Sequence, residues 1–176
     1  MSYQFCPKCT KKLTKRSPSL YVCKNCGFHL YENPRPTNAV ILENENGEIL
    51  FIKREFPPKK NYWDLPGGFV NLNESLEHSV KREIKEELGF DIGDFRYVSS
   101  NYGRYLYKGV NYHTLCFTFL SKLHTRKVKT SSTEGSLRFF ARNKIPLQRI
   151  AFIEVKKGLE KYLSSFQQSP TAKSRK

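Results

Sequence analysis

Three glutamates in the middle of the chain have the residue types and the spacing of a divalent-cation site. An expected helix contains Glu83, Glu86 and Glu87. Each residue of a helix advances by ~100° around the axis, so the three side chains share an arc of roughly 100° beside the apolar face of this helix. Glu83 and Glu87 are four residues apart, and like charges at this spacing cost a helix about 0.2–0.5 kcal/mol. Mg²⁺ and Mn²⁺ prefer carboxylate oxygens, so a cation would offset this repulsion. On the helix alone, a solvated face balanced by neighbouring basic residues remains an alternative.

Four cysteines form two Cys-x-x-Cys pairs, Cys6 with Cys9 and Cys23 with Cys26. Two such pairs let four thiolates converge on one tetrahedral ion, which predicts a structural Zn²⁺ in a small zinc ribbon. Two disulfides are the alternative, but they need an oxidising compartment, and a redox dithiol would need only one pair. Cys116 stands in an apolar segment and is expected in the core.

A helix expected over residues 73–89 would position the glutamates. Asn73 is predicted to cap its N-terminus, and Gly89 is predicted to take the left-handed conformation after its last turn. Apolar residues recur at every fourth position and would face the core: Leu76, Val80, Ile84 and Leu88. Residues 63–68 lead into this helix through two glycines, where the backbone can approach a ligand closely.

The pattern of residues 68–90 is Gly-x5-Glu-x7-Arg-Glu-Ile-x-Glu-Glu-x-Gly-Phe. It resembles the Nudix box at every fixed position. The resemblance implies a Nudix hydrolase domain over residues 37–165, an α/β/α sandwich around a mixed sheet. It also implies hydrolysis of a nucleoside diphosphate linked to another group, with catalysis by metal-activated water. Together with the zinc ribbon over residues 1–36, the architecture is similar to that of bacterial NADH pyrophosphatases.

The resemblance assigns roles to particular residues. The catalytic glutamates that would hold Mg²⁺ or Mn²⁺ are Glu83, Glu86 and Glu87, with the carbonyl of Gly67. Arg82 and Glu74 are expected to orient these ligands through a salt bridge. Glu134 lies where some members place a further metal-binding or basic carboxylate, although an ordinary loop glutamate is the alternative. Either Glu86 or Glu134 would take the proton from the attacking water, and the sequence leaves this choice open.

The substrate is less well defined by the sequence. Residues 99–107 lack the SQPWPFPxS stretch of NADH pyrophosphatases, and the proline that ADP-ribose enzymes carry after the box is also missing. Tyr105 and Tyr107 lie at roughly the place of a tyrosine in dinucleoside-polyphosphate enzymes. We expect a loop here whose aromatic rings stack on a base, with Arg104 near phosphate and Tyr62 as a further contact. Aromatic residues that belong partly to the core are the alternative.

The net charge of +15 is unevenly distributed. Residues 1–36 carry +6 and residues 121–176 carry +11, whereas residues 37–120 carry −2. A basic surface attracts polyanions, although it could serve solubility alone. The alternative function is therefore a nucleic-acid-binding zinc-ribbon protein with pyrophosphohydrolase activity directed to RNA ends. The intact box favours the nucleotide enzyme. Dimerisation through the ribbon stays open.

The remaining elements fit one mixed α/β domain. Residues 39–42 and 49–52 read as strands around an Asn-Gly turn. Further strands are expected at 95–99, 113–120 and 137–140, with a helix over 150–166. The basic tail of residues 166–176 is expected to be disordered. No apolar run is long enough to span a membrane and the N-terminus lacks secretory-signal features, so we expect a cytoplasmic protein without a membrane partner.

Overall fold

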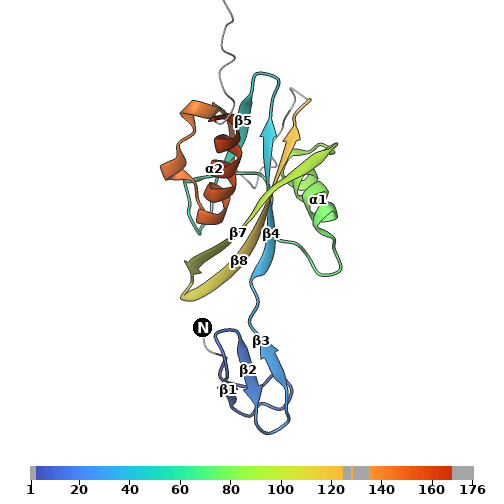
Figure 1. Cartoon of the computed structure of the whole chain (residues 1–176), viewed down its shortest axis with the longest axis vertical. Coiled ribbons are helices and arrows are strands. Elements are labelled where there is room, and N and C mark those ends of the chain that lie inside the picture. The colour runs from blue at the N-terminus through green and yellow to red at the C-terminus, as the bar shows by residue number, and fades with distance from the viewer. Residues whose placement is uncertain (1–2, 125–127, 129–134, 168–176) are drawn as a thin grey trace, which may run out of the picture.

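A short three-stranded sheet precedes the main body of the protein (Figure 1). The computed structural model describes residues 3–124, 128 and 135–167. The strands of the small sheet are antiparallel and follow chain order: β1 (Leu13–Lys15), β2 (Leu20–Cys23) and β3 (His29–Tyr31). All four cysteines of the two Cys-x-x-Cys pairs lie in or beside this sheet, an arrangement that is compatible with the expected zinc ribbon.

The main body is built on a six-stranded mixed sheet. Its strands are β4 (Arg35–Glu43), β5 (Glu48–Lys53), β6 (Trp63–Asp64), β7 (Phe95–Tyr107), β8 (Val110–Lys122) and β9 (Ser136–Ala141). The order is β6-β5-β4-β8-β7, and β9 pairs with β5. Strands β4 and β8 run parallel, whereas the other pairs are antiparallel. The mixed sheet is confirmed.

Among the described residues, the α-helices α1 (Leu76–Leu88) and α2 (Ile153–Gln167) cover opposite faces of this sheet (Figure 1). Two short 3-10 helices, Arg142–Lys144 and Leu147–Arg149, precede α2. Successive residues of a strand point to opposite faces, so each central strand contributes to two cores. The core under α2 includes Ala39, Ile41, Ile49, Phe51, Cys116, Val155, Leu159 and Tyr162. The core under α1 includes Val40, Leu42, Leu50, Ile52, Val80, Ile84 and Leu88. The α/β/α sandwich and the core position of Cys116 are confirmed.

Helix α1 begins later than the sequence suggested. Asn73 is not the cap, because its backbone has a φ of 61° and lies in the left-handed region. Ser75 caps the helix instead, with its hydroxyl accepting the backbone N–H of His78 at 3.2 Å. The helix ends as predicted, with Gly89 in the left-handed conformation at a φ of 77°. Glu74 is consequently left outside the helix, where its carboxylate can reach other elements.

Strands β7 and β8 are longer than expected, and this corrects the prediction of a loop over residues 99–107. The two strands stay paired up to Tyr107 and Val110. Lys108 and Gly109 form the turn, and both have positive φ, 47° and 74°. A two-residue turn of this kind matches the twist of paired strands. The hairpin predicted around the Asn-Gly turn between β4 and β5 is confirmed.

The ends of the main body are defined by β4 and α2. Strand β4 already begins at Arg35, and α2 continues to Gln167. The division into a ribbon, a hydrolase domain and a tail stays a prediction, and the predicted tail from residue 168 onward lies outside the described residues. Within residues 3–124, 128 and 135–167, no helix is long and apolar enough to cross a membrane.

Candidate active site and metal centres

Two glycines between β6 and α1 bring the backbone against the glutamates. Gly67 has a φ of 138°, and a Cβ atom there would overlap the carbonyl oxygen of Asn38. The N–H of Gly67 donates to Glu87 Oε2 at 2.9 Å. A Cβ atom at Gly68 would lie 2.5 Å from Glu83 Oε1. Only glycine permits both approaches, so the turn and the helix form one unit.

Arg82 organises the carboxylates around this turn. Its guanidinium binds Glu74 through two bonds, Nε to Oε1 at 2.8 Å and Nη2 to Oε2 at 3.0 Å. Its Nη1 donates to Glu83 at 2.8 Å and to Glu86 at 2.9 Å, and Nη2 also donates to the carbonyl of Phe69. The hydrogen bonds from Arg82 lower the pKa of Glu74 to about 2, and the same contacts raise the pKa of Arg82. Arg82, which the sequence predicted to pair with Glu74, thus also contacts two of the predicted metal ligands, Glu83 and Glu86.

The three glutamates differ in exposure. The side chain of Glu83 is 14% exposed and that of Glu86 58% exposed, whereas Glu87 is buried. The group of three carboxylates is therefore buried where Glu87 contacts Gly67 and exposed to solvent at Glu86. Hard carboxylate oxygens in an open site suit Mg²⁺ or Mn²⁺. Glu134, the fourth predicted carboxylate, lies outside the described residues.

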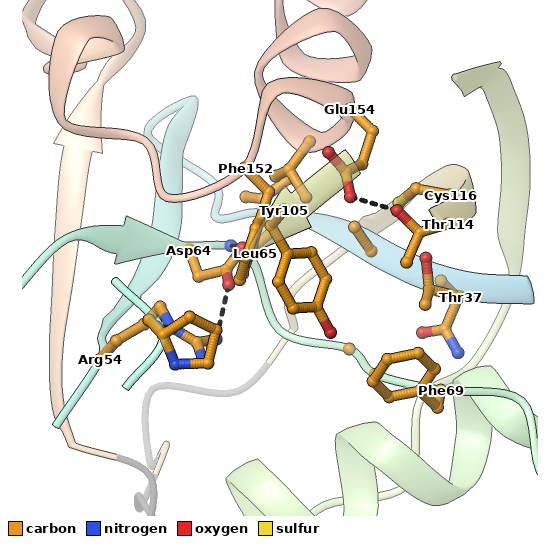
Figure 2. Close-up of a pocket in the computed structure, with 16 residues that line it drawn as sticks. Thr37, Arg54, Asp64, Leu65, Phe69, Tyr105, Thr114, Cys116, Phe152 and Glu154 are labelled. Atoms are coloured by element: carbon orange, nitrogen blue, oxygen red, sulfur yellow. Dashed lines mark hydrogen bonds and ion pairs between the residues drawn. The ribbon is translucent and has the colours of Figure 1, made fainter. Parts of the chain in front are cut away.

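Two adjoining cavities lie beside the glycine turn. The larger, of about 190 Å³, lies between the sheet and the start of α2 (Figure 2). The smaller, of about 70 Å³, is lined by Glu87. They share four lining residues: Arg54, Asp64, Leu65 and Gly67. The larger cavity therefore adjoins, through these residues, the cavity that Glu87 lines.

The shared wall carries an ion pair that the sequence reading missed. Arg54 donates from Nη1 to Asp64 Oδ2 at 3.0 Å and from Nε to the carbonyl of Pro58 at 3.0 Å. Its guanidinium also lies 4.9 Å from the ring centre of Phe152. Burial raises the pKa of Asp64 to about 6 and outweighs the opposing effect of Arg54. No spacing marks these residues, because Arg54 follows β5, Asp64 ends β6 and Phe152 precedes α2.

The structure brings three of the four predicted substrate residues together and leaves Tyr107 apart. Tyr105 lines the larger cavity, where its ring stacks on Tyr112 at 5.3 Å and contacts Phe152 at 5.2 Å. Tyr62 and Arg104 line a neighbouring open hollow together with Tyr105. Tyr107 pairs with Val110 beside the hairpin turn and is not among the residues that line the larger cavity. Of the four predicted residues, Tyr105 is therefore the one that lines the larger cavity.

The cysteine cluster has the dimensions of a zinc site. The Sγ atoms of Cys6, Cys9, Cys23 and Cys26 all lie within 4.8 Å of one another. Cys6 and Cys26 are 3.7 Å apart and Cys9 and Cys23 are 3.5 Å apart, close to the ~3.8 Å edge of a tetrahedron with Zn–S bonds of 2.3 Å. All are free thiols, so the alternative of two disulfides is wrong for this structure. A backbone hydrogen bond from Lys11 is the largest effect lowering the pKa of Cys9, to about 6, whereas the hydrogen bond with Cys9 helps to raise the pKa of Cys26 to about 12. The geometry of the four sulfur atoms, and not these opposite shifts, is what fits a zinc ion.

Comparison with known proteins agrees with the box and the fold. The NUDIX domain model matches residues 33–161. An ADP-ribose pyrophosphatase of Methanocaldococcus jannaschii is 33% identical over 127 residues, which cover 71% of either chain. A protein of Haemophilus influenzae (strain PittGG), NAD-capped RNA hydrolase NudC, is 32% identical over 102 residues, covering 56% of this chain. The chain spans only 38% of the length of that relative.

A solved structure extends the likeness over nearly the whole chain. The NUDIX hydrolase from Nitrosomonas europaea is 26% identical and superposes with a TM-score of 0.66. The match covers 94% of this chain and 93% of the other, so it exceeds the range matched by the domain model. With the box, the glutamate-bearing helix and the sandwich all in place, the chain belongs to the Nudix family.

Proposed function

We propose that this chain is a metal-dependent pyrophosphohydrolase that cleaves the diphosphate linkage of a nucleoside diphosphate derivative. The substrate class is NADH or NAD, ADP-ribose or a dinucleoside polyphosphate. The observation that carries this proposal is the arrangement of Glu83, Glu86 and Glu87 on α1, fixed by Arg82 and Gly67 beside two adjoining cavities. The name of the Methanocaldococcus relative, ADP-ribose pyrophosphatase, supports the substrate class.

The chain's own groups divide the work. Glu83, Glu86 and Glu87 would hold Mg²⁺ or Mn²⁺, which on binding offsets negative charge on the diphosphate and acidifies a water. Arg82 keeps two of the carboxylates in place before any ligand arrives, so little reorganisation is needed. Glu86 is the most exposed of the three and can receive a proton from water in the open part of the site. Glu134 is the alternative base.

The substrate would span the two cavities. A base fits the larger cavity, whose walls include the rings of Tyr105, Phe152 and Phe69. Arg54 lies at the junction with the cavity of Glu87, where its guanidinium can contact the diphosphate. Three contacts already hold Arg54, so it loses little side-chain freedom when a phosphate binds.

A nucleotide panel tests this function. NADH, NAD⁺, ADP-ribose, dinucleoside polyphosphates, FAD and nucleoside triphosphates should be incubated with Mg²⁺ or Mn²⁺, and the products identified. Hydrolysis of a diphosphate linkage in at least one of them, lost on adding a chelator, is expected. Activity that survives complete removal of divalent cations would overturn the proposal.

For the ribbon we propose a structural Zn²⁺ bound by the four thiolates. A closed set of four cysteines leaves no open position for a substrate. Thiols of this kind persist in reducing compartments, which supports the proposed cytoplasmic location. Metal analysis of the purified protein should give about one zinc per chain. A zinc-free protein with an ordered ribbon would contradict this role.

A second candidate function is pyrophosphohydrolase activity directed to RNA ends. It is favoured by the charge of +6 in residues 1–36 and by the name of the Haemophilus relative, NAD-capped RNA hydrolase. If lysines and arginines neutralise the phosphates of a bound RNA, its affinity should fall steeply as the salt concentration rises. Gel shifts at several salt concentrations, run beside hydrolysis of capped RNA and of free nucleotides, distinguish the two candidates.

A further inference from the structure

Glu154 is a buried carboxylate on the wall of the larger cavity, outside the Nudix box. It lies in the first turn of α2 and is 4% exposed. Its Oε1 accepts the hydroxyl of Thr114 on β8 at 2.5 Å. Figure 2 shows Glu154 and Thr114 on one side of the cavity, Asp64 and Arg54 on the other, and Tyr105 between them.

The neighbouring strand is shaped around this carboxylate. A Cβ atom at Gly103 of β7 would overlap the carboxyl group of Glu154. Within the described residues Glu154 forms no salt bridge, in contrast to Asp64 across the cavity. A buried carboxylate without a cation is costly unless hydrogen bonds satisfy it. The Thr114 hydroxyl supplies one donor, and the carboxylate has capacity for more.

A second acceptor in the same cavity, the side-chain oxygen of Asn38, has no donor at all among the described residues. Asn38 is buried and lines the cavity, and its Nδ2 donates to Ser79 Oγ at 2.8 Å. Its Oδ1 has no hydrogen-bond partner among the described residues. Orphaned buried acceptors are rare in folded proteins. The cavity therefore combines aromatic walls with acceptors, which suits a flat ring that carries N–H donors.

We propose that Glu154 is a specificity-determining residue that accepts a hydrogen bond from the exocyclic amino group of the substrate's base. This inference rests on the proposed function, and it favours adenine over hypoxanthine. A carboxylate can only accept, so a base with a carbonyl oxygen in place of the amino group would set two acceptors against each other. Sites built to bond a donor strongly reject analogues that lack it.

The test compares ADP-ribose with its hypoxanthine counterpart, in both hydrolysis and binding. We expect the wild type to prefer the adenine substrate by about 10- to 100-fold in kcat/KM and in affinity. Glu154→Gln keeps the shape and offers an N–H as well as a carbonyl oxygen, so the preference should fall to within about 3-fold. Glu160→Gln, an exposed change on the same helix, is the control and should keep the wild-type preference.

A second pair of variants tests the close contact between Gly103 and the carboxyl group of Glu154. Gly103→Ala should displace the Glu154 carboxylate and weaken the preference, whereas a Cβ atom at Gly93 meets nothing within 4 Å, so Gly93→Ala should not. Equal use of both bases by the wild type, or an equal loss for both bases in Glu154→Gln, would overturn the inference while the hydrolase stands. Selective binding of the adenine nucleotide without hydrolysis of any nucleotide in the panel would instead overturn the proposed function and leave the inference. Failure to bind either ADP-ribose or its hypoxanthine counterpart would overturn the inference, while the proposed function would be decided by the remaining nucleotides of the panel.

Discussion

The two candidate metal centres of this chain hold their ligands in opposite ways. In the ribbon, the sulfur atoms of the two Cys-x-x-Cys pairs surround a single point, all within 4.8 Å of one another. On α1, three carboxylates lie on one side only, and Arg82 and Gly67 hold them in place. A closed set of ligands stabilises a fold, whereas a one-sided set leaves room for water and substrate. Protein contacts thus hold the glutamate site ready for chemistry, whereas the bound metal itself would hold the ribbon together.

The largest effect expected is at the open centre. Glu86→Gln keeps the size of the side chain and removes its charge, so kcat should fall by ~10²–10⁴ if Glu86 is the base. If Glu86 is mainly a ligand, extra Mn²⁺ should partly restore the rate. Steady-state kinetics on an active nucleotide provide the measurement. Glu77→Gln, on an exposed position of the same helix, should change little, and wild-type activity of Glu86→Gln would remove this residue from the mechanism.

The second-largest effect is expected at Arg54 and should appear in substrate binding more than in the chemical step. Arg54→Ala should raise KM by about 10- to 100-fold with a smaller change in kcat, because a charged hydrogen bond to the substrate is lost. Lys53→Ala is the matched control, since this neighbouring residue is absent from the lining of both cavities. An unchanged KM for Arg54→Ala would place the diphosphate elsewhere.

A smaller effect on activity is expected at the closed centre. Cys23→Ser should lose about one zinc per chain and loosen the ribbon, because metal binding is coupled to its folding. Hydrolysis of a free nucleotide should persist at a reduced but measurable rate. Metal analysis and kinetics on the same sample check both points. Complete loss of activity with an intact main body would show that hydrolysis depends on the ribbon as well.

The smallest effect concerns the ion pair between Arg82 and Glu74, which supports the glutamate site. The pKa of Glu74 is about 2, below the ordinary 4.5, because of the hydrogen bonds from Arg82. The stabilisation is therefore fully present above pH 4.5 and is lost as the pH falls toward 2. Urea midpoints measured across this window should decline less in Glu74→Gln than in the wild type. Parallel curves for the two proteins would show that the ion pair adds no stability.

The sequence predicted the elements whose signals are local. The stripe from Leu76 to Leu88, the glycine at the end of α1 and the Asn-Gly hairpin all depend on neighbouring residues. The predicted start of α1 was wrong because Asn and Ser are both favourable N-cap residues, and the sequence offers one at position 73 and the other at position 75. The backbone of Asn73 takes the left-handed conformation in the connection from the glycine turn, which leaves Ser75 in the capping position. Local preference alone could not choose between them.

The rest of the site depends on contacts between distant segments. Arg54, Asp64, Tyr105 and Glu154 come from four separate segments of the chain, and no spacing in the sequence relates them. The loop predicted over residues 99–107 is a strand because β8 provides a partner along its whole length. Its glycine and tyrosines resemble loop composition when read alone. Only the packing of α2 against β7 reveals that Gly103 accommodates Glu154.

The short connection between the ribbon and the main body has a consequence for any ligand that both could touch. Only residues 32–34 separate β3 from β4, and fully extended they span about 10–11 Å. Strand β4 goes on to line the larger cavity with Thr37, Asn38 and Ala39. A polyanion captured by the ribbon would thus be confined to a small volume around the cavity, at an effective concentration in the millimolar range. Weak binding at the ribbon would then be enough to supply the site with one end of a long substrate.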